Sequence, residues 1–460
     1  NRLGVFWLTA GINEAIKQDV PIELADAVMS RPVGIPKTGV FGLVDLVGVD
    51  LMPHLSDSLL STLPKNDTYR DIYVDYKFVH QMIDAGYTGR KGKGGFYRLN
   101  PDTKGREKQA LALGDGSAFS EAQYSKADKP SDPAIDAGKS GLRAVVETDS
   151  PAGRYAWAVL RDTLHYAASL VGEIADTIYD IDRGMTLGYN WKMGPFEMLD
   201  VLGPAWFVSK LKEEGLDVPD FLAKIGDKTF YKVENGERHY FGTNGKYHEI
   251  KHPDGVLLLE DIKRKAEPVF KNGSAKVWDI GDGVLCFEHT TKMNTFDEQI
   301  FDLLEQTIAT IEKDETYKAL VIYNEASHFS AGANLGLALF MINIAMWPQV
   351  EGFISRGQEI FMKLKFSNFP VIGAPSGMAL GGGCEILLAS DAVQAHAETY
   401  TGLVEVGVGI IPGWGGCKEM ILRLQERERT KYKKDLGKIE AEKLWFSPDT
   451  TPMGPVRKAF

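Results

Sequence analysis

Residues 379–391 read ALGGGCEILLASD, with three consecutive glycines directly before an apolar stretch of helical character. A glycine in or beside regular structure costs about 0.5–1 kcal/mol in conformational entropy relative to alanine. Such a run is kept where bare backbone has to approach another group closely. Glu385 follows the glycines among apolar residues, where an unpaired carboxylate is costly or has a raised pKa. The stretch therefore predicts a turn that places free backbone N–H groups beside one secluded acid.

A second turn of the same kind occurs earlier in the chain. The strand-like ALVIYN of residues 319–324 leads into FSAGANL at 329–335, just as the strand around Val371 leads into ALGGGCE. Each glycine run alone is also typical of simple close packing. Together, two turns built from small residues allow two N–H groups to converge on one oxygen. Each such donor to a developing oxyanion contributes about 2.7–4 kcal/mol in known cases.

A second acid, Glu405, lies in GLVEVGVGIIPGWGG at residues 402–416, again among apolar residues and glycines. Each glutamate alone is equally well explained by a buried ion pair or a helix end. Two carboxylates shielded from solvent, beside two N–H donors, suit the addition of water to a double bond conjugated with a carbonyl. One acid takes a proton from water, and the other delivers a proton to carbon.

The pattern of residues from 276 onward alternates between strands and helices. Residues 284–289 predict a strand, and Thr295 with Glu298 predicts a capping box at the start of a helix. Further strands follow at 319–324 and 369–377. This alternation predicts an α/β layer architecture with parallel strands. We expect the apolar run at 335–347 to be a buried helix, because it is too short to span a bilayer.

The first half of the chain is helical and contains an internal repeat. KTGVFGLVDLVG at 37–48 and KMGPFEMLDVLG at 192–203 match at a constant offset of 155 residues. Aromatic and polar residues alternate around two Asn-Gly pairs at 229–250, which predicts a small β-meander attached to the second copy. Residues 100–150 are rich in small and charged residues and predict a linker.

Composition restricts the classes of function. The 460 residues suggest two to four domains, and the formal net charge of -11 argues against a nucleic-acid partner. The three cysteines fit neither a disulfide framework nor a clustered zinc site, so we expect a reducing, cytoplasmic location. None of the nine histidines has metal-ligand spacing, and we expect no metal and no membrane span.

The three motifs FSAGANL, ALGGGCEILLASD and EVGVGIIPGWGG resemble the successive signatures of the crotonase superfamily, specifically its enoyl-CoA hydratases. By that resemblance, the N–H groups of Ala333 and Gly382 form the oxyanion hole. Glu385 activates the water, and Glu405 exchanges the proton at the α-carbon. The resemblance covers residues 276–424 and implies a ββα superhelix.

The chain departs from the hydratase pattern at two positions near Ala333. The lysine that hydratases often place near the CoA adenosine is replaced by Gly336, and the usual aspartate is Asn334. Contacts to the nucleotide end of CoA are therefore not predicted. The resemblance also ends before the last helices of the family, so we expect a crotonase-like domain that is truncated at its C-terminus.

NRLGVFWLTAGINEAI at residues 1–16, with the first repeat and GRKGKGGFY at 89–97, resembles the C-terminal helical domain of 3-hydroxyacyl-CoA dehydrogenases. The second copy resembles the duplicated domain of multifunctional β-oxidation enzymes. Asn1 then corresponds to the asparagine of the Asn-Arg signature that positions substrate. The catalytic histidine and the nucleotide-binding half would precede Asn1, so we expect this fragment to bind no cofactor itself, with NAD used by the full-length chain.

These observations predict a multidomain chain with two all-α repeat domains, the second carrying the meander, followed by an α/β crotonase-like domain. The expected boundaries are 1–100, a linker at 101–150, 151–272 and 273–460. The predicted function is hydration of trans-2-enoyl-CoA to 3-hydroxyacyl-CoA in fatty acid β-oxidation, coupled to NAD-dependent oxidation. Alternatives are a Δ3,Δ2-enoyl-CoA isomerase and a non-catalytic acyl-CoA-binding or assembly module. The expected partners are acyl-CoA substrates, further copies of the chain and, by resemblance, a thiolase.

Overall fold

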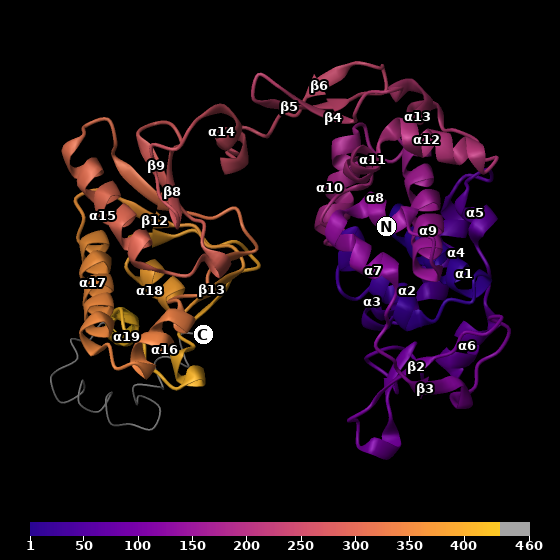
Figure 1. Ribbon diagram of the computed structural model, residues 1–460, viewed down its shortest axis with the longest axis horizontal. Helices are drawn as coiled ribbons and strands as arrows, with labels where there is room; N and C mark the ends of the chain where they lie inside the picture. Colours follow the sequence, from indigo (N-terminus) through magenta and orange to yellow (C-terminus); the bar gives the residue numbers. More distant parts are fainter. Residues whose placement is uncertain (433–460) are drawn as a thin grey trace. The chain divides into compact units, whose positions relative to one another are not determined.

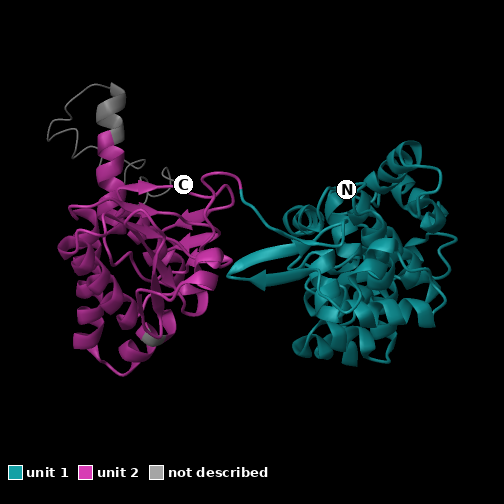
Figure 2. Cartoon of the chain, turned by 90° about the horizontal axis from the view of Figure 1, so that it is seen from above, with its two compact units in different colours: residues 1–252 teal, residues 253–460 magenta. Residues whose placement is uncertain are grey.

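The computed structural model of the protein describes residues 1–432. The chain divides into two units, Asn1–His252 and Pro253–Phe460, coloured separately in Figure 2. Each unit has its own buried apolar core. Among the described residues, no helix has the length and apolar character needed to cross a bilayer.

Unit 1 is mainly helical and has a single core. Its long helices α1 and α9 pack against each other. Figure 1 follows the helices along the chain. They are α1 (Arg2–Lys17), α2 (Ile22–Val28), α3 (Phe41–Val47), α4 (Leu51–Thr62), α5 (Tyr69–Ile72), α6 (Lys77–Asp84), α7 (Pro133–Ala137), α8 (Leu142–Glu147), α9 (Pro151–Ser169), α10 (Ile178–Gly188), α11 (Pro195–Leu202), α12 (Pro204–Glu213) and α13 (Asp220–Ile225).

Unit 1 also holds two small antiparallel sheets. Their strands are β1 (Tyr97–Leu99), β2 (Lys108–Leu111) and β3 (Tyr124–Lys126) in one sheet, and β4 (Tyr231–Glu234), β5 (Glu237–Phe241) and β6 (Tyr247–Glu249) in the other. The sequence predicts a linker over residues 101–150, but the structure packs this segment into the core. It supplies β2, β3, α7 and α8, and buries Leu111, Leu142 and Val145. Its few apolar residues are spaced so that almost all of them face inward.

The two similar motifs, at residues 37–48 and 192–203, make equivalent contacts in the two halves of unit 1. Asp26 accepts hydrogen bonds from the N–H of Phe41 at 2.8 Å and of Gly42 at 2.9 Å. A Cβ at Gly39 would lie 2.5 Å from the Asp26 carboxylate, so a glycine at this position of the first motif leaves room for the aspartate side chain.

In the second copy, Asp182 accepts from the N–H of Phe196 at 2.9 Å and of Glu197 at 3.2 Å. A Cβ at Gly194 would lie 2.2 Å from the Asp182 side chain. Each aspartate also accepts from a tyrosine hydroxyl of the following strand, Tyr97 in the first copy and Tyr231 in the second. In both motifs, therefore, the shared glycine leaves room for the aspartate and the shared phenylalanine donates its N–H to it.

Unit 2 contains a six-stranded sheet in the order β14-β12-β10-β9-β8-β7, whose four strands from β14 to β9 are parallel. The strands are β7 (Phe270–Lys271), β8 (Ala275–Asp279), β9 (Val284–His289), β10 (Ala319–Ile322), β12 (Val371–Gly373) and β14 (Ala392–Val393). The helices are α14 (Leu259–Lys265), α15 (Glu298–Lys313), α16 (Leu335–Asn343), α17 (Trp347–Lys365), α18 (Gly382–Leu388) and α19 (Gly416–Tyr432).

A second, smaller parallel sheet lies within unit 2 and positions the residues of interest. It consists of β11 (His328–Ser330), β13 (Met378–Leu380) and β15 (Tyr400–Gly402), in that order. Because all three strands run in the same direction, the segments that follow them leave from one edge. Those segments are the FSAGANL turn, the glycine run and the stretch that carries Glu405.

Two local predictions in unit 2 are wrong. The cap of α15 is Asp297, whose carboxylate accepts the Ile300 N–H at 3.0 Å, and not Thr295. The apolar run at 335–347 is not a buried helix: it is divided between α16 and the start of α17, and Leu339 and Phe340 are more than half exposed. A segment that is apolar on all sides cannot bury every side when it packs against one neighbouring helix.

Candidate active site

The pairing of β11 with β13 brings the two glycine-containing turns into contact. A Cβ built on Gly332 would lie 2.8 Å from the Leu380 carbonyl oxygen and 2.9 Å from the Gly382 nitrogen. Gly332 also has φ +84°, a conformation that side chains disfavour. This glycine is therefore required by the close approach of the two backbones.

Ala333 forms a parallel β-bridge with Phe296, and this bridge determines the direction of the Ala333 N–H. Phe296 donates to the Gly332 carbonyl at 2.9 Å and accepts from the Asn334 N–H at 3.3 Å. In this pattern the residue between the two bonded neighbours turns its own N–H away from Phe296. Within residues 1–432, no protein acceptor lies within hydrogen-bonding distance of the Ala333 N–H. That group is free to bind a ligand oxygen.

The N–H of Gly382 is free because it begins α18. Gly381, with φ +55°, accepts hydrogen bonds through its carbonyl from Cys384 at 2.8 Å and Glu385 at 2.9 Å. The first N–H groups of a helix have no acceptor within that helix. The described part of the chain supplies none for Gly382 either.

Glu385 lies one turn into α18 and is only 3% exposed. Its Oε1 accepts the backbone N–H groups of Trp414 at 2.8 Å and Gly416 at 2.9 Å. Burial raises the pKa of Glu385 to about 7, the two N–H groups oppose that rise, and the negative charge of Glu405 adds to it. A carboxyl group with a pKa near 7 suits proton transfer at neutral pH.

Glu405 opens the short 3₁₀ helix Glu405–Val408 after β15 and is 8% exposed. Its Oε1 lies beside Gly381, 3.2 Å from where a Cβ on that glycine would stand. Its Oε2 is buried and has no hydrogen-bond partner among the described residues. Burial raises the pKa of Glu405. A buried carboxyl oxygen without a donor is expensive, which is typical of a group that works on a ligand or water.

The structure thus gathers the four predicted residues of unit 2 around one pair of turns. Sequence reasoning missed the two donors to Glu385, the N–H groups of Trp414 and Gly416. Both lie in the GWGG stretch at 413–416, which closes the motif that begins at Glu405. Its signal was the glycine content just before α19, which permits backbone to approach a buried carboxylate.

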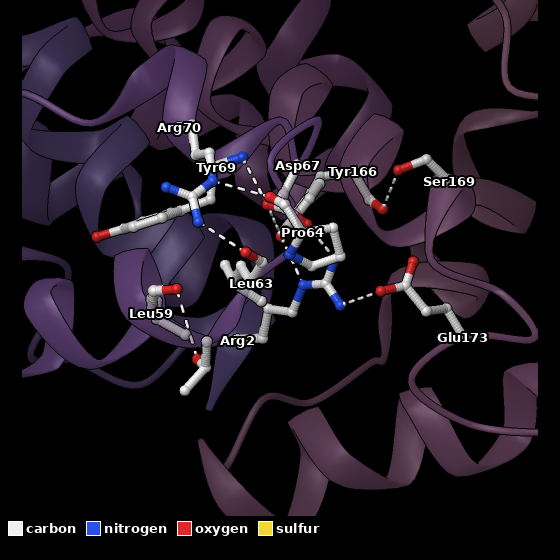
Figure 3. A network of polar contacts seen from close by, with 11 residues as sticks. Arg2, Leu59, Leu63, Pro64, Asp67, Tyr69, Arg70, Tyr166, Ser169 and Glu173 are labelled. Carbon is white, nitrogen blue, oxygen red and sulfur yellow. Dashed lines mark hydrogen bonds and ion pairs between the residues drawn. The ribbon is translucent and has the colours of Figure 1, made fainter.

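Asn1 lies in unit 1, at the N-terminus of α1, where it is exposed and its side chain makes no capping hydrogen bond. The neighbouring Arg2 fixes this end of the helix (Figure 3). Arg2 donates to the Tyr166 hydroxyl at 2.8 Å and pairs with Asp67 and Glu173. The network ties the start of α1 to the end of α9, and among the described residues the Asn1 side chain makes no hydrogen bond.

No group of three or more metal-ligating side chains occurs in the described ranges. The basic residues Lys91 and Lys93 of the GRKGKGGFY turn contact Asp50 and the Ala85 carbonyl. This is the behaviour of a solvated turn.

Comparisons with known proteins match both halves of the chain. The enoyl-CoA hydratase/isomerase family matches residues 283–431, and the C-terminal domain family of 3-hydroxyacyl-CoA dehydrogenase matches residues 1–99 and 153–240. A protein of Rickettsia felis named as a fatty acid oxidation complex trifunctional enzyme is 36% identical over 98% of this chain and 58% of its own. A protein of Bacillus subtilis named as a 3-hydroxyacyl-CoA dehydrogenase is 33% identical over 92% of this chain and 53% of its own.

The chain therefore spans a little more than half the length of these relatives. Among solved structures, an enoyl-CoA hydratase from Bacillus anthracis is 24% identical, with a TM-score of 0.31. It covers 35% of this chain and 67% of its own.

Proposed function

Residues 1–99 and 153–240 match the 3-hydroxyacyl-CoA dehydrogenase C-terminal family and residues 283–431 match the enoyl-CoA hydratase/isomerase family, and on this premise we propose that unit 2 hydrates trans-2-enoyl-CoA to 3-hydroxyacyl-CoA. The observation that carries the proposal is the convergence of two unpaired N–H groups with two buried glutamates. In the whole protein, this product would be oxidised by the dehydrogenase part during fatty acid oxidation.

In the proposed reaction, the N–H groups of Ala333 and Gly382 donate to the thioester carbonyl oxygen. As negative charge develops on that oxygen, both hydrogen bonds strengthen and lower the barrier. The ionised Glu385 removes a proton from water, the water oxygen bonds to the β-carbon and the double bond opens. The protonated Glu405 then delivers its proton to the α-carbon. The next cycle begins once Glu385 has released its proton and Glu405 has regained one.

The residues present in this chain do not fit NAD. The parallel strands β9, β10 and β12 are each followed by a segment without a Gly-x-Gly-x-x-Gly motif, which dinucleotide-binding turns use for the pyrophosphate. NAD use belongs to our proposal for the whole protein. Asn1 would there position the 3-hydroxyacyl substrate, and its unengaged side chain is compatible with that role.

We further propose that unit 1 consists of two copies of one helical domain, the second with an added β-meander. Support comes from the paired contacts of Asp26 and Asp182. The dehydrogenase C-terminal family also matches both halves separately. The equivalent contacts of Asp45, with the N–H groups of Phe96 and Tyr97, and of Asp200, with those of Phe230 and Tyr231, extend the parallel.

We also propose a cytoplasmic location and self-association for the enzyme. Cys286, Cys384 and Cys417 are all free thiols, which suits a cytoplasmic protein. The exposed Leu339 and Phe340 offer apolar surface for association with further copies of the chain. A thiolase partner rests on resemblance alone, and co-sedimentation with the thiolase of the same organism would test it.

Substrate preference separates hydration from the isomerase alternative. We expect crotonyl-CoA to be hydrated at least 100-fold faster than a 3-enoyl-CoA of equal length is isomerised, because two proton-shuttling acids are present where isomerisation needs one. The loss of absorbance of the conjugated enoyl thioester measures the first rate, and its gain measures the second. Faster isomerisation would assign the site to the isomerase instead. Binding of acyl-CoA without any turnover would make the chain a non-catalytic module.

A further inference from the structure

The indole of Trp414 fills the space between the candidate site and α17. Four phenylalanines surround it edge-to-face, with ring centroids 5.4–5.5 Å away, and the residue is 7% exposed. The four are Phe296, Phe301, Phe353 and Phe361. Enclosed on these sides, the ring has little freedom to tilt or slide.

Two glycines meet opposite edges of this ring. A Cβ built on Gly357, inside α17, would lie 2.3 Å from Trp414 Nε1 on the five-membered ring. A Cβ on Gly382 would lie 2.3 Å from Cζ3 on the six-membered ring. The indole therefore spans the distance from the backbone of α17 to the turn that carries the free Gly382 N–H. A glycine at position 357 lowers the helical propensity of α17. The close approach of the indole to the backbone explains why glycine is nevertheless found there.

The backbone of the same residue holds Glu385. The Trp414 N–H donates to Oε1 at 2.8 Å, and the Gly416 N–H two residues later donates to the same oxygen at 2.9 Å. The side chain of Trp414 and its main chain thus touch two different parts of the candidate site.

We propose that Trp414 is a positioning residue, a strut seated on Gly357 that fixes the Glu385 carboxylate relative to the Gly382 N–H. The proposal rests on the hydratase function proposed above and deepens it. It predicts that Gly357 in α17 affects chemistry in which α17 takes no direct part. A displacement of about 1 Å between a catalytic group and its substrate costs on the order of 100-fold in rate.

The strut also sets the ionisation of Glu385. The Trp414 and Gly416 N–H groups favour the carboxylate, so their loss raises its pKa further. The other titratable groups near Glu385 are Glu405 from the 3₁₀ helix, Cys384 on its own helix and Cys417 on α19. Burial raises the pKa of both thiols, so they stay neutral near pH 7. Arg423 of α19 donates to the Leu388 carbonyl at the end of α18, and Glu405 is the other acid whose ionisation acts on Glu385.

A matched pair of substitutions in α17 tests the strut. Gly357→Ala places a methyl group against the indole, whereas Gly352→Ala, in the same helix, meets nothing within 4 Å. In the full chain we expect Gly357→Ala to lower kcat for crotonyl-CoA about 100-fold, to change KM less than threefold and to move the acidic limb of the pH profile to higher pH. Gly352→Ala should match the parent in all three.

A double substitution separates the strut from general damage to the fold. Trp414→Phe removes the ring edge that Gly357→Ala would strike, so we expect it alone to lower kcat about tenfold. Adding Gly357→Ala to Trp414→Phe should cause less than a further threefold loss. Circular dichroism would show whether Gly357→Ala unfolds the protein. If it does, the kcat and pH profile of Trp414→Phe alone test the proposal. A parental kcat and pH profile in either folded single variant overturns the proposal.

A measurement without turnover keeps the two proposals distinct. In protein labelled with carboxyl-¹³C glutamate, the Glu385 resonance is assigned by its loss in Glu385→Gln and titrated by NMR. Its pKa should rise in Gly357→Ala and stay at the parental value in Gly352→Ala. An inactive parent contradicts the proposed function only, whereas equal Glu385 pKa values in the two variants overturn the strut.

Discussion

Glu385→Gln is expected to lower kcat for crotonyl-CoA hydration by about 10³-fold to 10⁴-fold, the upper part of the range for loss of a positioned general base. Glutamine keeps one oxygen to accept the N–H groups of Trp414 and Gly416, so the geometry of the site survives. It cannot take a proton from water. The rate should be measured by stopped-flow absorbance with the parent and the variant at equal concentration.

The pH dependence gives this substitution a second signature. With a Glu385 pKa of about 7, the parent rate should fall tenfold per unit as the pH drops below 7, because the base becomes protonated. The variant should lack that limb. Stability should also depend on pH differently: the free energy of unfolding of the parent should fall as the pH rises from about 4.5, where the unfolded carboxyl ionises, to about 7, where the buried Glu385 does, and the glutamine variant should lack this fall.

Glu398→Gln is the matched control, since Glu398 is exposed and lies in the same part of unit 2. It should retain the parental kcat and pH profile. If Glu385→Gln behaved like Glu398→Gln, Glu385 could not be the base. A thermal midpoint close to the parent's, read by circular dichroism, ensures that lost activity does not reflect lost structure.

The largest loss of stability is expected in unit 1, from Asp182→Ala. Asp182 is 3% exposed and accepts from two backbone N–H groups and from the Tyr231 hydroxyl at 2.8 Å. Alanine leaves all three donors buried without an acceptor. Each such group costs about 1–3 kcal/mol, so the free energy of unfolding should fall by at least about 3 kcal/mol. Urea unfolding followed by circular dichroism measures the change.

Asp26→Ala should cost a similar amount, because Asp26 accepts from the equivalent three donors. Asp227→Ala, at an exposed position, should change the free energy of unfolding by less than about 0.5 kcal/mol. Unequal losses for the two buried aspartates would argue against equivalent roles in two copies of one domain. A loss at Asp182 no larger than at Asp227 would contradict the buried network itself.

Features that depend on short-range pattern were predictable from the sequence. The strand predicted at 284–289 matches β9, and the first half of the chain, predicted to be helical, begins with α1 (Arg2–Lys17). The glycine run and the FSAGANL turn were predicted to meet, and the parallel pairing of β11 with β13 brings them together. In such turns, the small residues that let two backbones approach each other are visible in the sequence.

Features that depend on long-range packing were not predictable in this way. The donors to Glu385 are selected by tertiary contact rather than by local spacing. Residues 101–150 look like a linker because their composition is polar, yet a few inward-facing side chains suffice to anchor them. The apolar run at 335–347 shows the reverse case, in which strong hydrophobicity did not produce burial.

Trp414 illustrates the same limit at the candidate site. Its sequence neighbourhood indicates a flexible glycine-rich loop, whereas four aromatic rings from distant segments hold it in place. The glycine at 357 looks like a mere weakness of α17 until the indole opposite it is known. Reading either residue correctly requires the three-dimensional structure.

The most direct test of the account is a crystal structure of the protein with butyryl-CoA, a saturated thioester that cannot be hydrated. We expect the thioester oxygen to lie about 2.7–3.1 Å from the nitrogens of both Ala333 and Gly382, with Glu385 and Glu405 facing the β- and α-carbons. A thioester oxygen bonded elsewhere, or N–H groups of Ala333 and Gly382 that point apart, would contradict it.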